Sequence, residues 1–94
     1  MDAEKKQLAE TQIDKIQVET AAILAAHRKR IGKRIVELRN AEGISQNKLG
    51  QLAGVSSSNI GKIELAQFNP GLETLCKIGD ALGFDVDFVP KKPK

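Results

Sequence analysis

The sequence predicts an all-α bundle with a long N-terminal helix and a short C-terminal β-strand. Apolar residues recur at helical spacing through most of the chain, and only the last residues alternate between apolar and charged side chains. The 94 residues allow one small domain with a modest core. We therefore divide the chain into an N-terminal amphipathic helix (1–30), a helical domain (31–83) and a C-terminal dimerisation strand with a basic tail (84–94).

The N-terminal pattern predicts one long helix that can continue into the domain. No proline lies between Ala3 and Ala41, and Gly32 is the only glycine in that stretch. Apolar side chains recur at helical intervals at Ile13, Ile16, Ile23, Leu24, Ile31, Ile35 and Leu38. The exposed part of this stripe requires a partner, which can be a second copy, a groove in another protein, or the domain itself if a separate helix folds back.

The stretch from Ser45 to Glu64 predicts two short helices joined by a tight turn. Ser45 and Ser56 can cap the two helices, because a side-chain oxygen there accepts a hydrogen bond from a free N–H one turn later. Gly54 can end the first helix in the left-handed conformation. The apolar positions of the pair are Leu49, Leu52, Ala53, Ile60 and Ile63. This spacing is typical of a helix-turn-helix, which reads DNA through its second helix.

The same stretch resembles the XRE/Cro family, the lambda-repressor-like phage repressors and their bacterial relatives. The matching positions are Gln46, Leu49, Ala53, Gly54, Val55, Ile60, Ile63 and Glu64. The segments IGKRIVELRNAEGIS and NPGLETLCKIGDALG resemble the helices that flank the motif in that family, so the likeness extends from Ile31 to Phe84. Gly50 departs from the pattern, because the family usually has alanine at that position and glycine lowers helix propensity.

The outward positions of the second motif helix are candidates for reading base edges in the major groove. Lysine can donate to guanine, asparagine can pair with adenine, and serine can donate or accept. The base-reading candidates are Ser57, Ser58, Asn59 and Lys62. The alternative is a plain polar helix surface.

Further contacts with double-stranded DNA are expected at the phosphates. The resemblance implies a phosphate contact for Gln46 and places Asn69 in a loop that follows the DNA backbone, although Asn69 before Pro70 can equally be a turn residue. Lys33 and Arg34 are further phosphate candidates, with a solvated helix surface as the alternative.

One ion pair is expected within the domain. Arg39 and Glu64 match the family's pair between the first helix and the end of the recognition helix. Such a pair contributes little at the surface, but losing one partner costs much more when the other is buried.

The last residues predict a strand that pairs with its copy. Phe84, Val86 and Phe88 alternate with aspartates, and a lone strand leaves its backbone groups unpaired. We therefore expect an antiparallel ribbon across a dimer. This ending resembles that of antitoxins similar to HipB. A basic tail follows, with Lys91, Lys92 and Lys94.

Catalysis, metal binding and cofactor binding have no support in the sequence. His27 is the only histidine and Cys76 the only cysteine, so no ligand cluster can form from these residue types. Cys76 lies in a helical pattern with Leu72, Leu75 and Leu82, which predicts a small buried core residue. The chain lacks a membrane-length apolar run and a signal-peptide pattern, so we expect a cytoplasmic protein.

These patterns favour a dimeric repressor that binds a pseudo-palindromic operator. The formal charge of +3 agrees with DNA binding, although an ordinary solvated surface can carry so small an excess. One alternative is an antitoxin that binds a toxin protein and regulates its own operon. Another is a bridging module that contacts only proteins.

Overall fold

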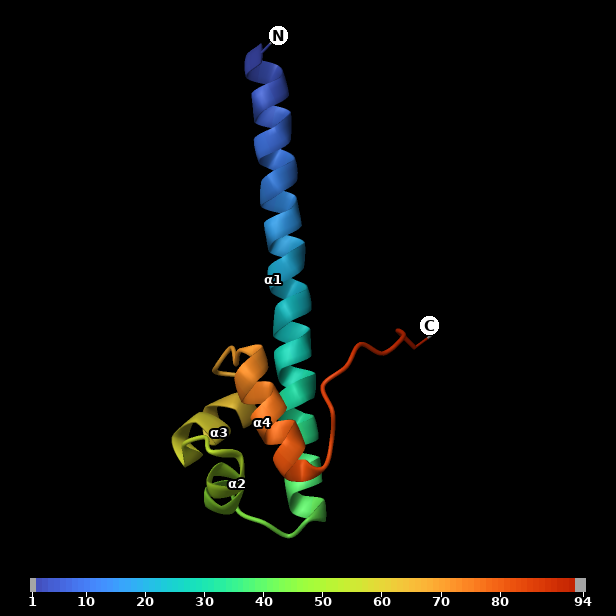
Figure 1. Cartoon of the computed structure of the whole chain (residues 1–94). Helices are drawn as coiled ribbons and strands as arrows, with labels where there is room; N and C mark the ends of the chain where they lie inside the picture. The colour runs from blue at the N-terminus through green and yellow to red at the C-terminus, as the bar shows by residue number, and fades with distance from the viewer. Residues whose placement is uncertain (1, 93–94) are drawn as a thin grey trace.

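The protein is all-α in the part that the structure describes. The computed structural model describes residues 2–92, and the side chains from residue 12 onward. Its helices are α1 (Asp2–Ala41), α2 (Gln46–Ala53), α3 (Ser57–Glu64) and α4 (Leu72–Leu82). Helices α2, α3 and α4 gather around the C-terminal half of α1, whereas the N-terminal half of α1 projects away from them (Figure 1).

Helix α1 runs for 40 residues without a break. It does not fold back on the domain, and every side chain of residues 12–27 is exposed. The apolar stripe predicted for this half is therefore open to solvent, with 53% of Ile13 and 56% of both Ile16 and Ile23 exposed. None of the helices described here has the length and apolar character needed to cross a membrane.

The core lies where the four helices meet. Its buried residues are Ile35, Leu49, Ala53, Ile60, Ile63, Ile78 and Leu82. Leu49 and Ile60, both from the predicted helix-turn-helix, are completely buried. Leu52 differs from its neighbours in this pattern, because 54% of it is exposed on the outer side of α2.

The predicted caps of the motif helices are confirmed. The Oγ of Ser45 accepts a 3.0 Å hydrogen bond from the Lys48 N–H, and the Oγ of Ser56 accepts one of 3.2 Å from the Asn59 N–H. Gly54 ends α2 with a φ of 69°, the left-handed conformation that glycine adopts without steric cost. These local interactions define where α2 and α3 begin and where α2 ends.

Close packing requires a glycine at Gly50. This corrects the interpretation from the sequence, in which Gly50 only departed from the family pattern and lowered helix propensity. A Cβ at this position would lie 2.5 Å from the Val55 carbonyl oxygen. The turn after α2 therefore passes too close to α2 for any larger side chain. The packing that this close approach of two backbone segments allows offsets the loss of helix propensity.

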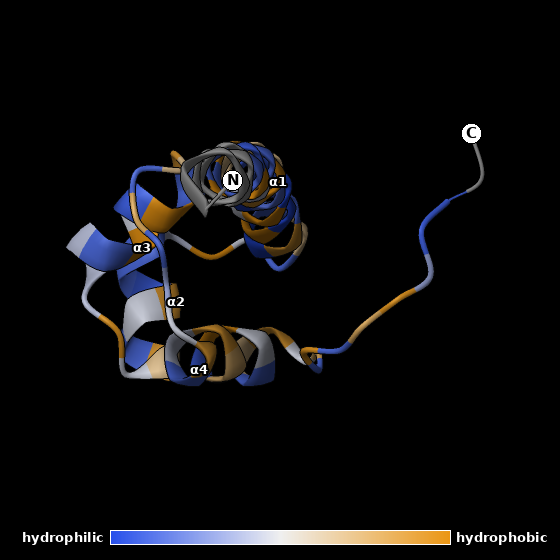
Figure 2. Ribbon diagram, turned by 90° about the horizontal axis from the view of Figure 1, so that it is seen from above, coloured by the Kyte–Doolittle hydropathy of each residue, from blue (hydrophilic) through white to orange (hydrophobic). Residues whose placement is uncertain are grey.

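The predicted C-terminal strand does not form in the single chain. No strand occurs within residues 2–92. Residues 84–87 line a groove with α1 and α4, and the chain then runs away from the helices (Figures 1 and 2). Phe84 and Val86 are each 47% exposed, and Phe88 is fully exposed. The physical reason is that a strand needs a neighbour for its N–H and C=O groups, and this segment has none here. Lys94 of the basic tail lies outside the described residues.

The expected burial of Cys76 is also wrong. Cys76 is exposed, and α4 instead turns Ile78 and Leu82 into the core. Two residues along a helix are about 200° apart, so Cys76 and Ile78 lie on opposite faces. Leu72, which shares the predicted stripe with Cys76, is 68% exposed as well.

Candidate DNA-binding surface

An open, largely polar hollow lies between the beginnings of α2 and α3. Its lining residues are Arg39, Ser45, Gln46, Asn47, Ser57, Ser58 and Gly61. The first turns of both helices face it, and their free N–H groups and helix dipoles favour negatively charged groups such as phosphates. Two helix N-termini therefore lie side by side at the hollow, and this arrangement favours the binding of a polyanion.

Two of the four base-reading candidates line this hollow, and the other two lie elsewhere on α3. Ser57 and Ser58 are exposed and line the hollow, at the beginning of α3. Lys62 is exposed one turn later on the same helix. Asn59 is half-buried, and its N–H donates to the capping Oγ of Ser56. The structure thus brings Ser57 and Ser58 into one surface with Gln46, and leaves Asn59 the least accessible of the four candidates.

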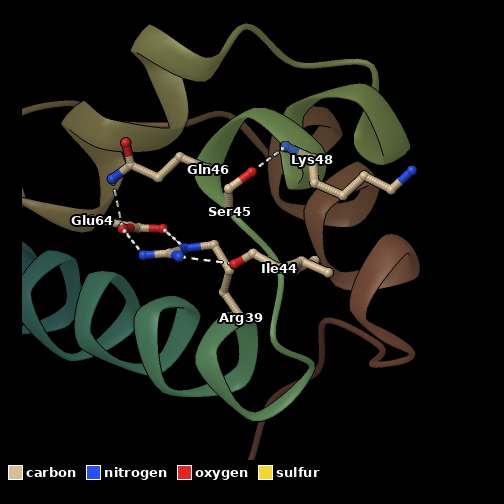
Figure 3. Close-up of polar contacts among 6 residues, drawn as sticks. All are labelled: Arg39, Ile44, Ser45, Gln46, Lys48 and Glu64. Atoms are coloured by element: carbon tan, nitrogen blue, oxygen red, sulfur yellow. Dashed lines mark hydrogen bonds and ion pairs between the residues drawn. The ribbon is translucent and has the colours of Figure 1, made fainter.

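Arg39, which lines the hollow, forms a bidentate ion pair with Glu64 (Figure 3). Arg39 Nε donates to Glu64 Oε2 at 2.9 Å and Arg39 Nη2 to Glu64 Oε1 at 3.1 Å. The side chains are only 14% and 4% exposed, respectively. Arg39 Nη1 also donates to the Ile44 carbonyl oxygen at 3.0 Å. The pair therefore ties the end of α1 to the end of α3 and to the loop before α2.

The hydrogen bond from Arg39 to Glu64 raises the pKa of the Arg39 guanidinium, and this effect exceeds the lowering caused by desolvation. Arginine is already protonated at all ordinary pH values. The stability that Arg39 contributes through this shift is therefore present throughout the neutral range, and would be lost only at strongly alkaline pH.

Gln46 extends the ion pair into α2. Its Nε2 donates to Glu64 Oε1 at 3.0 Å, so that a single carboxylate joins α1, α2 and α3 (Figure 3). The sequence did not predict this contact. The neighbouring Asn47 also lines the hollow, but it was not among the site residues predicted from the sequence. Its position beside Gln46, at the exposed beginning of a motif helix, was a signal that indicated such a place.

The other phosphate candidates lie outside the hollow. Arg34 forms an exposed i,i+3 ion pair with Glu37 at 3.3 Å and lines a different groove, between α1, α4 and the C-terminal segment. Lys33 is exposed on α1, and Asn69 is exposed in the loop between α3 and α4. The structure therefore does not group these three residues with the serines of α3.

The arrangement of two short crossed helices on a supporting bundle defines a helix-turn-helix protein. The model of the helix-turn-helix family HTH_3 matches residues 35–89, which is more than half of the chain. The chain belongs to this family.

The relatives of the chain include named regulators. A Haemophilus influenzae protein named as an uncharacterized HTH-type transcriptional regulator is 42% identical over 62 residues. The match covers 66% of this chain, which spans 63% of the length of that relative.

Two solved structures are similar in fold. The restriction-modification controller protein of Aeromonas hydrophila has a TM-score of 0.62 and 37% identity, over 64% of this chain and 91% of its own. A chain of a toxin-antitoxin module from Streptococcus pneumoniae has a TM-score of 0.63 and 30% identity, over 84% of this chain and 91% of its own.

Proposed function

We propose that this protein is a sequence-specific DNA-binding transcriptional regulator that represses transcription as a homodimer on a pseudo-palindromic operator. The observation that carries the proposal is the exposed beginning of α3, with Ser57 and Ser58 beside Gln46 in one polar hollow. Membership of the helix-turn-helix family and the similarity to named regulators support it.

In this proposal α3 enters the major groove. Ser57 and Ser58 contact base edges near the beginning of the helix, and Lys62 donates to guanine O6 and N7 one turn later. Lys33 and Asn69 contact phosphates at the margins of the surface. The phosphate contacts supply much of the affinity, so binding weakens as the salt concentration rises.

Lys62→Ala is expected to weaken binding to the preferred operator about tenfold, because a lysine-to-guanine contact discriminates by about 1–3 kcal/mol. Binding to unrelated duplexes should change much less. The measurement is fluorescence anisotropy at one fixed salt concentration, on an operator selected from randomised duplexes. Lys77→Ala is the matched control, because this substitution removes the same charge at a different place. Lys77 lies on α4, where it pairs with Glu73 at 3.2 Å. An equal loss on all duplexes would instead make Lys62 a phosphate contact.

The homodimer is proposed to form through residues 84–88. Phe84, Val86 and Phe88 are exposed in the single chain, and pairing with a second copy would satisfy the backbone and cover these side chains.

Phe88→Asp is expected to convert the dimer into a monomer with an unchanged fold, because Phe88 is fully exposed within the single chain. Size-exclusion chromatography with light scattering measures the mass, and circular dichroism checks the helix content. Leu72→Asp places the same charge on another exposed apolar position and should leave the dimer intact. A Phe88→Asp protein that remains dimeric would place the interface elsewhere.

A second candidate function is that of an antitoxin that binds a toxin and also regulates its own operon. The similarity to the Streptococcus pneumoniae toxin-antitoxin chain covers 84% of this chain, compared with 64% for the controller protein, and therefore extends beyond the helix-turn-helix. The exposed apolar stripe of α1 is the surface available for such a partner. Co-expression with the protein encoded beside it, followed by size-exclusion chromatography, separates this function from a free-standing repressor.

A further inference from the structure

An apolar groove, the α1–α4 groove, lies between α1 and α4. Its apolar lining comes from Ile31, Ile35 and Leu38 of α1 and from Leu75, Ile78 and Leu82 of α4. The groove has a volume of about 250 Å³. Since a cavity of about 150 Å³ already accommodates a benzene ring, the groove is large enough for one phenylalanine side chain.

The C-terminal arm (residues 84–89) begins at this groove and then leaves it. The Phe84 N–H donates to the Gly79 carbonyl oxygen at 2.8 Å, which fixes the arm where it leaves α4. Val86 faces α4, because its Cγ2 would lie 3.8 Å from a Cβ built on Gly79. Side chains alternate along an extended segment, so Phe84 and Phe88 share the face of Val86. Phe88 itself lies beyond the helices and is fully exposed (Figures 1 and 2).

Antiparallel pairing of two arms about Val86 would bring Phe88 of a second copy to this groove. In that register Phe88 of each copy lies directly opposite Phe84 of the other, with the two side chains on one face and their Cβ atoms about 4.5–5.5 Å apart. Phe84 lines the groove. Because each chain carries both a groove and an arm, a two-fold axis gives both copies the same contact.

The charges at the groove favour an acidic arm. Arg30 lines the groove from α1, and its Nη2 donates to His27 Nδ1 at 2.6 Å rather than to a carboxylate. Pairing about Val86 places Asp85 opposite Asp87 of the second copy, and like charges in that position repel each other. The positive charge of Arg30 reduces this repulsion, which a neutral groove would leave in full.

We propose that Phe88 of each copy in the homodimer fills the α1–α4 groove of the other copy. This inference rests on the homodimer of the proposed function and assigns a binding site to its exposed phenylalanine. The two copies exchange their C-terminal arms: the paired strands set the register, and the groove buries the aromatic ring.

The test places a fluorophore and a quencher on different copies of the full chain. The chain has no tryptophan or tyrosine, so the indole introduced by Phe88→Trp is its only strong fluorophore. The other copy carries Cys76→Ser and Arg34→Cys, with a nitroxide label on the introduced thiol. Arg34 is exposed at the groove, and its pair with Glu37 contributes little. We expect an excess of the labelled copy, once equilibrated, to quench most of the indole emission.

A nitroxide label on the native Cys76 is the matched control. Cys76 is exposed and lies on the face of α4 opposite to Ile78, which lines the groove. This label should therefore quench the indole far less. Phe88→Tyr, which adds only one hydroxyl group to the native ring, repeats each measurement so that the size of the indole does not decide the result.

The outcomes separate this inference from the proposed homodimer. If light scattering shows a dimer but the two labels quench equally, or neither quenches, only this inference is overturned. An indole that is shielded from iodide at concentrations where the chain is monomeric would place the arm in its own groove, with the same result. A chain that is monomeric at every concentration overturns both the inference and the homodimer.

Discussion

Arg39→Ala is expected to lower the free energy of unfolding by about 3–5 kcal/mol, the usual cost of removing one partner of a buried ion pair. The substitution would leave the Glu64 carboxylate, which is 4% exposed, without its two hydrogen bonds from Arg39. The Ile44 carbonyl oxygen would also lose its donor. Urea denaturation followed by circular dichroism measures the effect, and a small domain can lose a large part of its stability this way.

Arg34→Ala is the matched control for this loss. Arg34 lies on the same helix and pairs with Glu37, but the two side chains are 61% and 51% exposed. An exposed pair of this kind contributes about 0–1 kcal/mol. If Arg39→Ala were no more destabilising than Arg34→Ala, the Arg39–Glu64 pair would be solvated in solution and would not hold α1 to α3.

Gly32→Ala is expected to lower the free energy of unfolding by about 3 kcal/mol, at the upper end of the usual cost of overpacking. A Cβ on Gly32 would lie 2.5 Å from the Ile63 carbonyl oxygen and 2.7 Å from that of Glu64. Both are backbone atoms, so α1 and the end of α3 would have to move apart. The higher helix propensity of alanine offsets only about 1 kcal/mol of this cost.

Gly61→Ala separates the steric effect from helix propensity. Gly61 is also a helical glycine, but its nearest neighbour would be the flexible Gln46 side chain at 3.5 Å, which is an ordinary contact. We therefore expect Gly61→Ala to leave stability unchanged or to raise it by up to about 1 kcal/mol. Equal effects of Gly32→Ala and Gly61→Ala in urea denaturation would contradict the close approach of α1 and α3.

Features that depend on neighbours in the chain could be predicted from the sequence alone. Ser45, Ser56 and Gly54 define the motif helices through hydrogen bonds and backbone conformations that span only a few residues. The periodicity of Leu49 and Ile60 predicted the inner face of the motif, because helical geometry relates sequence spacing directly to direction.

Features that depend on packing between distant segments were decided only by the tertiary structure. The position of α4 turns Cys76 outward, although its periodicity with the leucines of that segment predicted a buried residue. The closeness of the turn to α2 explains Gly50, and the carboxylate of Glu64 decides how the Gln46 amide is turned. The extended end at Phe88 shows the same dependence, since a strand forms only when another strand supplies its hydrogen bonds. The spacing of residues along the sequence thus determined the helices. The surface that these helices present depends on distances between segments far apart in the sequence, which that spacing does not specify.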